Sequence, residues 1–428
     1  MPNMTTSQKI VIQTKKVAPI KKAIEELVAK ATAGEIGDAA VTLFDAIMQF
    51  AYAGRASDVH LEPWENGGKV RIRIDGILHD EFALDPYVHI QLIARLKILT
   101  RMRIDEHKAP QDGRFDFSAP EGDVDVRVSV IPTTFGEKAV LRLLSSQSHK
   151  LSLEELGFSD EDLKKVQHAI QKPWGMILAT GPTGSGKTTT IYAILEILNS
   201  REVNIATIED PVEFVIDGVN QSQVDQVAKL TFANGLRSLL RQDPDIIMVG
   251  EIRDQETAKI AVNAAMTGHK LLSTLHTNNA ATTLPRLIDM SVEPFLIAST
   301  LLIAIAQRLV RRVCPDCATK VDLTKKEAMD ILTKETIEEL FKGTDRVVVA
   351  KPNGCDKCIN TGYRGRVGIY EVLENSDALR ELIVVRAGSS KIEELAIKEG
   401  MTTMVQDGVR KILTLQTTVN EFIRVMQE

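Results

Sequence analysis

The 428-residue sequence has few aromatic residues, only four cysteines, no long apolar run and no excess of positive charge. Its longest apolar run, Leu296 to Ala306, is about half of the ~20 residues that a membrane-spanning helix needs. We expect this run to form a buried helix. The first residues show no basic start followed by a long apolar stretch, so we expect neither a secretory signal nor a membrane anchor. These absences predict a cytoplasmic protein.

The charge balance limits the class of partner. The 52 Lys and Arg residues against 58 Asp and Glu give a net charge of −6 at pH 7, and aromatic residues make up 4% of the chain. Proteins that hold nucleic acid nonspecifically combine a basic groove with aromatic stacking surfaces. The composition therefore argues against direct nucleic-acid binding, although a local basic groove is compatible with it.

The pattern along the chain predicts an α/β protein with more than one domain. Residues 1–40 are interpreted as an N-terminal linker or docking segment. Residues 41–149 open with an apolar helix and continue with alternating strands such as KVRIRIDGIL and VDVRVSVI, which predict a small mixed α/β domain. Residues 150–428 alternate strand-like runs (MILAT, VNIATI, DIIMVG, KLLSTL) with helices, the pattern of a parallel sheet flanked by helices. Within this larger domain we expect an insertion at 313–361 and a helical region at 377–428.

A phosphate-binding loop is the clearest chemical motif. The sequence GPTGSGKT at 181–188 matches GxxxxGK[ST], follows an apolar strand and precedes a helix. Its glycines let backbone N–H groups face phosphate oxygens, Lys187 offers a charge to the terminal phosphates, and Thr188 offers a hydroxyl to Mg²⁺. The alternative is a glycine turn with an incidental lysine, which would not need this context. The residues expected to bind ATP are Gly181, Pro182, Thr183, Gly184, Ser185, Gly186, Lys187, Thr188 and Thr189.

An acidic residue follows an apolar strand farther along the chain. The segment DIIMVGE ends at Glu251 and would deliver this carboxylate to the edge of the sheet beside the loop. A carboxylate there can orient and deprotonate the water that attacks the γ-phosphate, which makes Glu251 the candidate general base. The alternative is a surface acid after a strand, and the phosphate loop upstream argues against it.

Two further segments complete a recognisable set. TIEDPVEF at 207–214 and GHKLLSTLHT at 268–277, together with GPTGSGKTTT and RQDPDIIMVGEIRD, resemble the four nucleotide-site boxes of the type II secretion and type IV pilus assembly ATPases. The resemblance continues through SDVHLEP, VRIRIDG, APQDGRF and the segment 124–144, and covers most of the chain from about residue 41.

The resemblance implies a RecA-like ATPase domain and a hexameric ring that hydrolyses MgATP to move an inner-membrane platform protein in pilus assembly or protein secretion. It also implies cytoplasmic docking proteins and a peripheral association with the inner membrane through partners. Two other classes stay open. One is a RecA-like nucleic-acid translocase or DNA-uptake ATPase. The other is a nonhydrolysing nucleotide switch or zinc scaffold, which would not need Lys187, Thr188 and Glu251 together.

The two added boxes contribute acids and histidines. Glu209 and Asp210 follow a strand parallel to the others and would reach the metal and water side of the pocket. From the residues alone, an exposed turn before Pro211 is equally compatible, and the resemblance favours the functional role. His276 closes the strand KLLSTL and would sense the γ-phosphate, whereas His269 precedes that strand and should lie at its other end. A structural histidine at a strand end is the alternative.

Four arginines match, by resemblance, the family's arginines that approach the phosphates: Arg114, Arg127, Arg237 and Arg241. A guanidinium near the γ-phosphate stabilises transition-state charge. The first two lie outside the nucleotide-binding domain, so domain closure would be a condition for catalysis. The last two are four residues apart and would share one face of a helix, where a solvated basic stripe is the alternative. Arg364 and Arg366 match a family position less closely.

The four cysteines form two close pairs, Cys314/Cys317 and Cys355/Cys358. Four thiolates favour Zn²⁺ in a filled tetrahedral site, which is structural rather than catalytic. Assembly-type members of the family carry a similar tetracysteine insertion and retraction motors generally do not, so this resemblance points to assembly or secretion. Free buried thiols and a redox pair are the alternatives.

Overall fold

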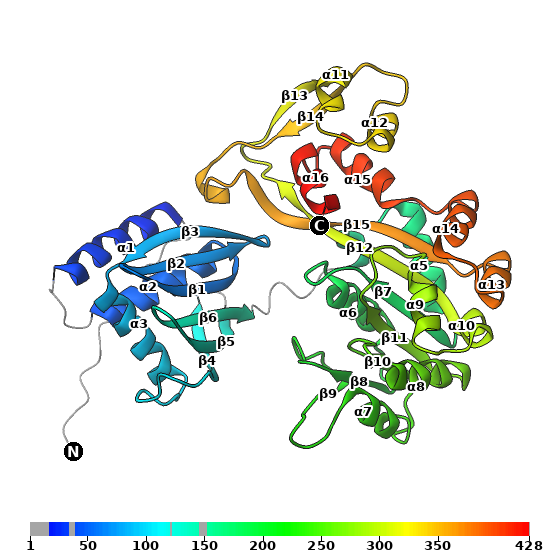
Figure 1. Cartoon of the computed structure of the whole chain (residues 1–428), viewed down its shortest axis with the longest axis horizontal. Coiled ribbons are helices and arrows are strands. Elements are labelled where there is room, and N and C mark those ends of the chain that lie inside the picture. The colour runs from blue at the N-terminus through cyan, green and yellow to red at the C-terminus, as the bar shows by residue number, and fades with distance from the viewer. Residues whose placement is uncertain (1–16, 34–38, 120–121, 145–151, 428) are drawn as a thin grey trace. The chain divides into compact units, whose positions relative to one another are not determined.

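The computed structural model describes residues 17–33, 39–119, 122–144 and 152–427 (Figure 1). The chain divides into two compact units. The smaller unit consists of Met1–Gln147, Cys314–Ala318 and Pro352–Gly365, and the larger unit of Ser148–Val313, Thr319–Lys351 and Arg366–Glu428. Of the expected linker or docking segment, residues 1–16 and 34–38 lie outside the described part of the chain.

The smaller unit contains a six-stranded sheet in the order β3-β2-β1-β6-β5-β4. Its strands are β1 (Ala56–Trp64), β2 (Gly67–Ile74), β3 (Ile77–Leu84), β4 (Gln111–Ala119), β5 (Gly122–Thr133) and β6 (Gly136–Leu144). All five neighbouring pairs are antiparallel. Apolar and polar residues alternate along β2, which buries Val70, Ile72 and Ile74 on one face and leaves the other face charged.

Three helices contribute to the apolar core of the smaller unit: α1 (Val17–Thr32), α2 (Ala39–Ala53) and α3 (Pro86–Leu99). Ile24 of α1, Phe50 of α2 and Leu92 of α3 are buried with the strands in one cluster. Asp85 precedes α3, and its side chain accepts a hydrogen bond from the N–H of Tyr87, which caps the helix start. The apolar strand faces therefore determine where the three helices pack.

The larger unit contains a seven-stranded sheet in the order β15-β12-β7-β11-β10-β8-β9. Its strands are β7 (Gly175–Thr180), β8 (Ile205–Glu209), β9 (Asn220–Gln223), β10 (Ile246–Val249), β11 (Lys270–Leu275), β12 (Leu301–Val313) and β15 (Tyr363–Glu374). The pairs from β12 to β9 are parallel. Every residue of β7, β8, β10 and β11 is buried, as strands covered on both faces require. The expected parallel α/β fold is thereby confirmed.

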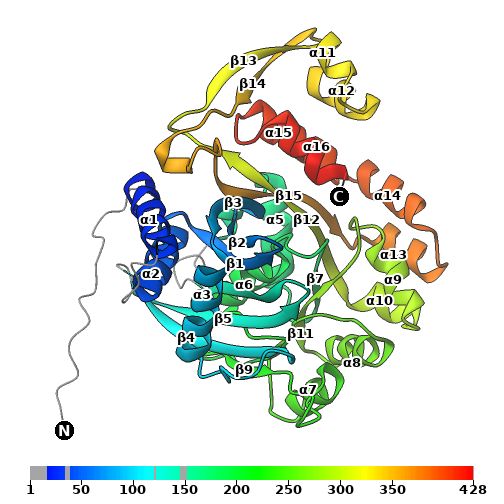
Figure 2. The same cartoon turned by 60° about the vertical axis from the view of Figure 1, so that its left-hand side comes forward.

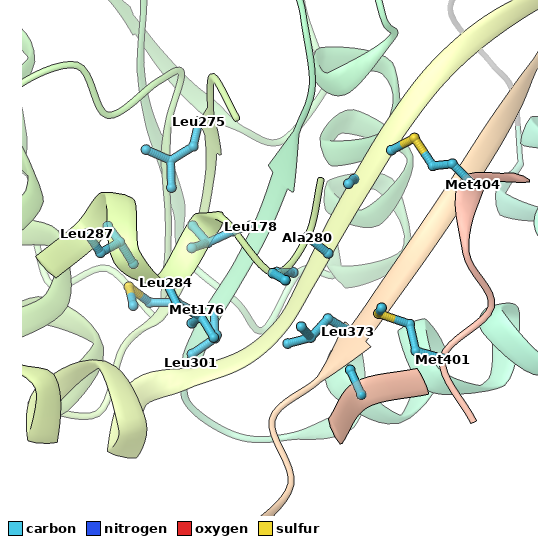
Figure 3. Close-up of a cluster of buried hydrophobic side chains, with 14 of the residues drawn as sticks. Met176, Leu178, Leu275, Ala280, Leu284, Leu287, Leu301, Leu373, Met401 and Met404 are labelled. Atoms are coloured by element: carbon cyan, nitrogen blue, oxygen red, sulfur yellow. The ribbon is translucent and has the colours of Figure 1, made fainter. Parts of the chain in front are cut away.

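Helices connect and cover these strands (Figures 1 and 2). They are α4 (Leu153–Leu156), α5 (Asp160–Gln171), α6 (Lys187–Leu198), α7 (Phe232–Leu239), α8 (Gln255–Met266), α9 (Thr283–Asp289), α10 (Pro294–Thr300), α13 (Asp377–Val384), α14 (Ser389–Lys398), α15 (Met404–Leu413) and α16 (Val419–Gln427). Figure 3 shows how Met176 and Leu178 of β7 meet Leu284 and Leu287 of α9 and Leu301 of β12 in one apolar cluster. None of the helices in the described ranges is long and apolar enough to cross a bilayer.

The apolar run from Leu296 to Ala306 corrects one expectation. It is buried as predicted, but it is not one helix: α10 ends at Thr300, and β12 begins at Leu301. β12 lies between β15 and β7, and consecutive residues from Ile303 to Gln307 are buried, so both faces of this part of the strand are covered and favour a continuous apolar sequence. Hydrophobicity without a clear period does not distinguish such a strand from a buried helix.

Residues 319–351 form a small lobe of the larger unit, drawn in yellow in Figure 2. The strands β13 (Thr319–Thr324) and β14 (Arg346–Lys351) pair antiparallel, and α11 (Lys325–Met329) and α12 (Lys334–Phe341) connect them. The cysteine-bearing segments on either side of this lobe, Cys314–Ala318 and Pro352–Gly365, belong to the smaller unit. We call these two segments the tetracysteine element.

Candidate nucleotide and metal sites

Four parallel strands of the larger unit end at one edge of its sheet. Gly181 follows β7, His276 follows β11, Glu251 follows β10, and Glu209 is the last residue of β8. Strand β11 lies between β7 and β10, so the histidine is placed between the glycine loop and the acidic residue. The carboxyl ends of parallel strands are where α/β proteins bind their ligands. We call this edge, with the loop at 181–188, the nucleotide edge.

The loop between β7 and α6 depends on glycine. A Cβ atom on Gly181, which has φ +142°, would lie 2.4 Å from the carbonyl oxygen of Gln307. Gly186 has φ +88° and precedes α6 without a side-chain cap. The N–H groups of the first turn of α6 are thus left for a ligand rather than for a capping side chain, the usual arrangement at a phosphate site.

The loop also holds a lysine and an unsatisfied hydroxyl. Lys187 is 8% exposed and donates hydrogen bonds to the carbonyl oxygens of Gly181 and Pro182, each at 2.9 Å. Burial lowers the pKa of Lys187, and the carboxylate of Glu251 partly offsets this effect. The Oγ atom of Ser185 is buried and has no hydrogen-bond partner among the described residues. A buried ammonium and an orphaned hydroxyl beside backbone N–H groups fit an anionic oxygen ligand such as a phosphate.

Glu251 is held by two neighbouring side chains. The Nε2 atom of His276 lies 3.3 Å from its Oε2 atom, and the guanidinium of Arg253 forms an ion pair with its Oε1 atom. Arg253 also lies 3.9 Å from a carboxylate oxygen of Asp210. The structure therefore brings together the two predicted residues, Glu251 and His276. It adds Arg253, which the sequence analysis missed although it lies only two residues after Glu251.

Glu209 lies at the end of β8, as expected, and its carboxylate contacts other protein side chains. It is 2% exposed, and its oxygens accept hydrogen bonds from Tyr192, Thr207 and Gln221. Burial and the nearby carboxylate raise the pKa of Tyr192. Both oxygens of Glu209 are therefore engaged by protein side chains. Asp210 beside it is exposed and faces Arg253, so it has the freer carboxylate.

The remaining candidates of the larger unit lie outside this cluster. His269 precedes β11, and its Nδ1 atom lies 2.9 Å from the carbonyl oxygen of Ala264. The guanidinium of Arg237 pairs with Glu256 at 2.5 Å, and Arg241 donates to the carbonyl oxygen of Arg237 at 2.8 Å. Among the described residues, no hydrogen bond or ion pair joins these three side chains to the loop at 181–188.

Arg114 and Arg127 belong to the smaller unit. They lie directly opposite each other on β4 and β5, on the charged face of the sheet. The guanidinium of Arg364 lies 3.8 Å from a carboxylate oxygen of Asp316, and Arg366 is exposed.

The four cysteines form one cluster. Their Sγ atoms all lie within 4.8 Å of one another, with Cys314 3.9 Å from Cys355 and Cys317 3.8 Å from Cys358. A tetrahedral zinc site with Zn–S bonds of ~2.3 Å requires sulfur atoms about 3.8 Å apart. Burial opposes ionisation of Cys358, but hydrogen bonds from the backbone N–H groups of Cys355 and Gly362 outweigh it and lower the pKa of this thiol to about 7. Distances and donor set both fit a tetrathiolate metal.

The tetracysteine element contacts the helices and strands of the smaller unit. The Cδ1 atom of Ile359 lies 2.6 Å from the position that a Cβ atom on Gly54 would occupy, so the close approach requires glycine there. Ile359 packs against the apolar core of this unit. The N–H of Gly365 donates to a carboxylate oxygen of Asp75 at 2.8 Å.

Comparison with known proteins identifies the family. Residues 36–424 match the family model described as type II/IV secretion system protein. The chain is 44% identical over 388 residues to the type II secretion system protein E of Aeromonas hydrophila, covering 91% of this chain and 76% of the relative. It is 45% identical over 385 residues to the type IV pilus assembly ATPase PilB of Myxococcus xanthus, covering 90% and 67%. The chain belongs to this family.

A solved structure supports the fold. The pilus retraction motor PilT with bound ADP superimposes with a TM-score of 0.58 at 28% identity, covering 89% of this chain and 96% of PilT. The larger unit thus has the RecA-like fold, as expected from the sequence.

Proposed function

We propose that the chain is the MgATP-hydrolysing motor subunit of a type II secretion or type IV pilus assembly machine. The chain is an ATPase, since its family consists of secretion and pilus ATPases. The observation that supports the chemistry is the convergence of Lys187, Glu251 and His276 at the carboxyl ends of adjacent parallel strands.

Each residue of the nucleotide edge has a role that its surroundings support. The loop from Gly181 to Thr189 binds the phosphates, and Lys187 transfers its hydrogen bonds from loop carbonyls to phosphate oxygens. Thr188 offers its hydroxyl to Mg²⁺, which when bound neutralises phosphate charge. Glu251 orients and deprotonates the attacking water. His276 and Arg253 hold this carboxylate in place.

Four further residues, Glu209, Asp210, Arg237 and Arg241, have roles that depend on more than their present contacts. Glu209 supports the end of β8 through its hydrogen bonds, and the role of ordering Mg²⁺ and its waters passes more readily to Asp210. Arg237 now pairs with Glu256, and Arg241 bonds to a backbone carbonyl. These two arginines can bind phosphates only if the C-terminal end of α7 moves.

The arginines of the smaller unit complete this proposal. Arg114 and Arg127 are paired residues on adjacent strands, and a guanidinium near the γ-phosphate stabilises the charge of the transition state. The domain at 41–149 then supplies these groups to the ATPase domain at 150–428 when the two close. A hexameric ring would let neighbouring subunits take part in that closure.

The cluster of four cysteines supports a structural Zn²⁺ site. Its resemblance to the tetracysteine insertion of assembly-type members favours a role in assembly or secretion rather than in retraction. The partners would be an inner-membrane platform protein and cytoplasmic docking proteins, with the motor in the cytoplasm and held at the membrane through them. No direct contact with nucleic acid is required.

The test is steady-state MgATP hydrolysis over a series of protein concentrations, each with and without DNA. We expect the specific activity to rise with concentration, because sites shared between subunits need assembly, and to ignore DNA. Strong stimulation by DNA would instead favour a nucleic-acid translocase. An absence of ATP hydrolysis at every concentration would contradict the motor itself.

A further inference from the structure

Glu371 is a buried acid that the proposed chemistry does not use. It lies on β15 and is 3% exposed. Among the described residues, no basic side chain forms an ion pair with it. Its partners are backbone groups: the N–H of Ala280 donates to its Oε1 atom at 2.8 Å, and the N–H of Met404 at the start of α15 also donates to it. A carboxyl buried without a cation is costly, so a position that keeps one needs a physical explanation.

One of these partners belongs to the segment that follows His276. The residues 276–282 connect β11 to α9. At the start of this segment, the N–H of Thr277 donates to the Oγ1 atom of Thr180 at 3.0 Å, and Thr180 is the last residue of β7 before the phosphate loop. The hydroxyl of Thr277 also lies 3.1 Å from that of Thr283. The first half of the segment is thereby fixed to the strand that carries the loop.

The second half of the segment is fixed by Glu371. Ala280 is fully buried, and Figure 3 shows it in the same apolar cluster as Leu373, Met401 and Met404. Apolar contacts of this kind have little directional preference, whereas a hydrogen bond to a carboxyl specifies both the position and the orientation of an N–H group. The hydrogen bond from Ala280 is therefore the directional contact that joins this half to β15, whereas the hydrogen bonds between Asn279 and Thr282 lie within the segment.

We propose that Glu371 is a positioning residue for ATP hydrolysis: its carboxyl fixes the segment 276–282 so that His276 meets Glu251. The inference rests on the proposed ATPase function. It assigns to β15, the strand that leaves the tetracysteine element, a role at the nucleotide edge that none of the four family boxes contains. Loss of the Glu371 contact lets the segment shift and separates the imidazole from the carboxylate that it holds at 3.3 Å.

The ionisation of Glu371 supplies a signature of this role. Burial, assisted by the nearby carboxylate of Glu393 on α14, raises the pKa of the Glu371 carboxyl to about 7, although the N–H groups of Ala280 and Met404 oppose the shift. The carboxylate of Asp407 on α15 lies nearby, where it accepts a hydrogen bond from the N–H of Tyr370, the residue before Glu371. The ionised carboxylate accepts from both N–H groups more strongly than the neutral acid does. The hold on the segment thus strengthens as the pH rises through 7.

The experiment is a double-mutant cycle on the full-length protein with Glu371→Ala and His276→Ala, followed by kcat and KM for MgATP. We expect Glu371→Ala to lower kcat about tenfold and to leave KM within about twofold. His276→Ala should then cost much less in the Glu371→Ala background than in the wild type. Glu374→Ala is the matched control, because Glu374 lies on the same strand, is exposed and pairs with His168 at 3.0 Å.

Glu371→Gln keeps the size of the side chain but cannot ionise, and it serves if the alanine variant does not fold. Between pH 6 and pH 8, we expect the ratio of wild-type kcat to Glu371→Gln kcat to rise, because only the wild-type side chain gains a charge in this range. A constant ratio, or effects of Glu371→Ala and His276→Ala that simply multiply, would overturn the positioning role. Wild-type protein without ATPase activity would instead contradict the proposed function.

Discussion

The nucleotide edge and the tetracysteine element both collect residues that are far apart in the sequence, but they do so by different routes. At the nucleotide edge, sheet order alone brings together the residues that follow β7, β11 and β10. In the tetracysteine element, two turns separated by a lobe of 33 residues (319–351) meet through four sulfur atoms and dock through Ile359 and Asp75. The first arrangement follows from a regular pattern, and the second depends on the shapes of particular side chains.

The largest effect is expected at the nucleotide edge. Lys187→Ala removes the buried ammonium that now bonds to the carbonyl groups of Gly181 and Pro182. We expect ATP hydrolysis to fall on the order of 10³-fold or more, because a phosphate site without this charge binds and stabilises the terminal phosphates poorly. Phosphate release and nucleotide binding measure the effect. Lys259→Ala, at an exposed lysine of α8, should leave both unchanged, and equal losses in the two variants would contradict the assignment.

A second substitution separates binding from chemistry at the same edge. Glu251→Gln keeps the shape of the side chain but removes the base, so we expect ATP binding to persist while turnover falls by about 10² to 10⁴-fold. Equilibrium binding and single-turnover hydrolysis test this difference. Glu202→Gln, at an exposed acid in the turn before β8, is the control. Normal turnover in Glu251→Gln would remove the residue from the base role and direct attention to Asp210.

The sequence predicted the parallel strands that end at the nucleotide edge, because the signals for these strands are local. Apolar runs predicted the strands β7, β10 and β11, and each run is followed by a glycine loop, an acid or a histidine. Because the strands are parallel, these residues lie at the same edge of the sheet. Prediction failed where the outcome depended on long-range packing. The run from Leu296 to Ala306 changes from helix to strand because β12 fills a place between two other strands, and that place is not encoded in the run.

The partners of individual side chains could not be predicted from the sequence either. Nothing in TIEDPVEF shows that Tyr192 and Gln221 engage Glu209 and leave Asp210 as the more open acid. The two Cys pairs predicted a shared site, whereas the contact of Ile359 with Gly54 joins residues about three hundred positions apart without any common pattern. Such contacts are decided by complementary shape rather than by periodicity.

The metal site should affect stability more than chemistry. We expect one Zn²⁺ per chain, and Cys314→Ser should release it and lower the unfolding midpoint by several degrees, while ATP hydrolysis per folded chain changes less. Metal analysis, thermal unfolding and phosphate release on the same samples separate these effects. Protein that is purified without chelators and contains no zinc would contradict the structural site.

The smallest effect isolates the docking of the tetracysteine element from metal binding. Ile359 is a β-branched residue with φ +53°, a backbone conformation that costs about 1–2 kcal/mol for such a side chain. Its packing against the core of the smaller unit offsets that cost. Ile359→Ala should therefore keep its zinc but lose about 1–2 kcal/mol of stability, since the side chain is only partly buried. Val348→Ala, at an exposed residue of β14, is the control.

Gly54 provides the matching substitution. Gly54→Ala would place a Cβ atom 2.6 Å from the Cδ1 atom of Ile359, so it should destabilise the wild type. In the Ile359→Ala background the new Cβ atom no longer meets the Cδ1 atom, and only the carbonyl oxygen of Phe50 at 3.1 Å remains close, so the cost of the change should shrink. Urea unfolding of the four proteins of this cycle, with zinc content measured for each, gives the coupling energy between the two positions. Independent effects of the two substitutions would mean that side-chain packing at Ile359 does not attach the tetracysteine element. The hydrogen bond to Asp75 and other backbone contacts would then hold it, and the element would resemble the nucleotide edge in depending on regular hydrogen bonding rather than on side-chain shape.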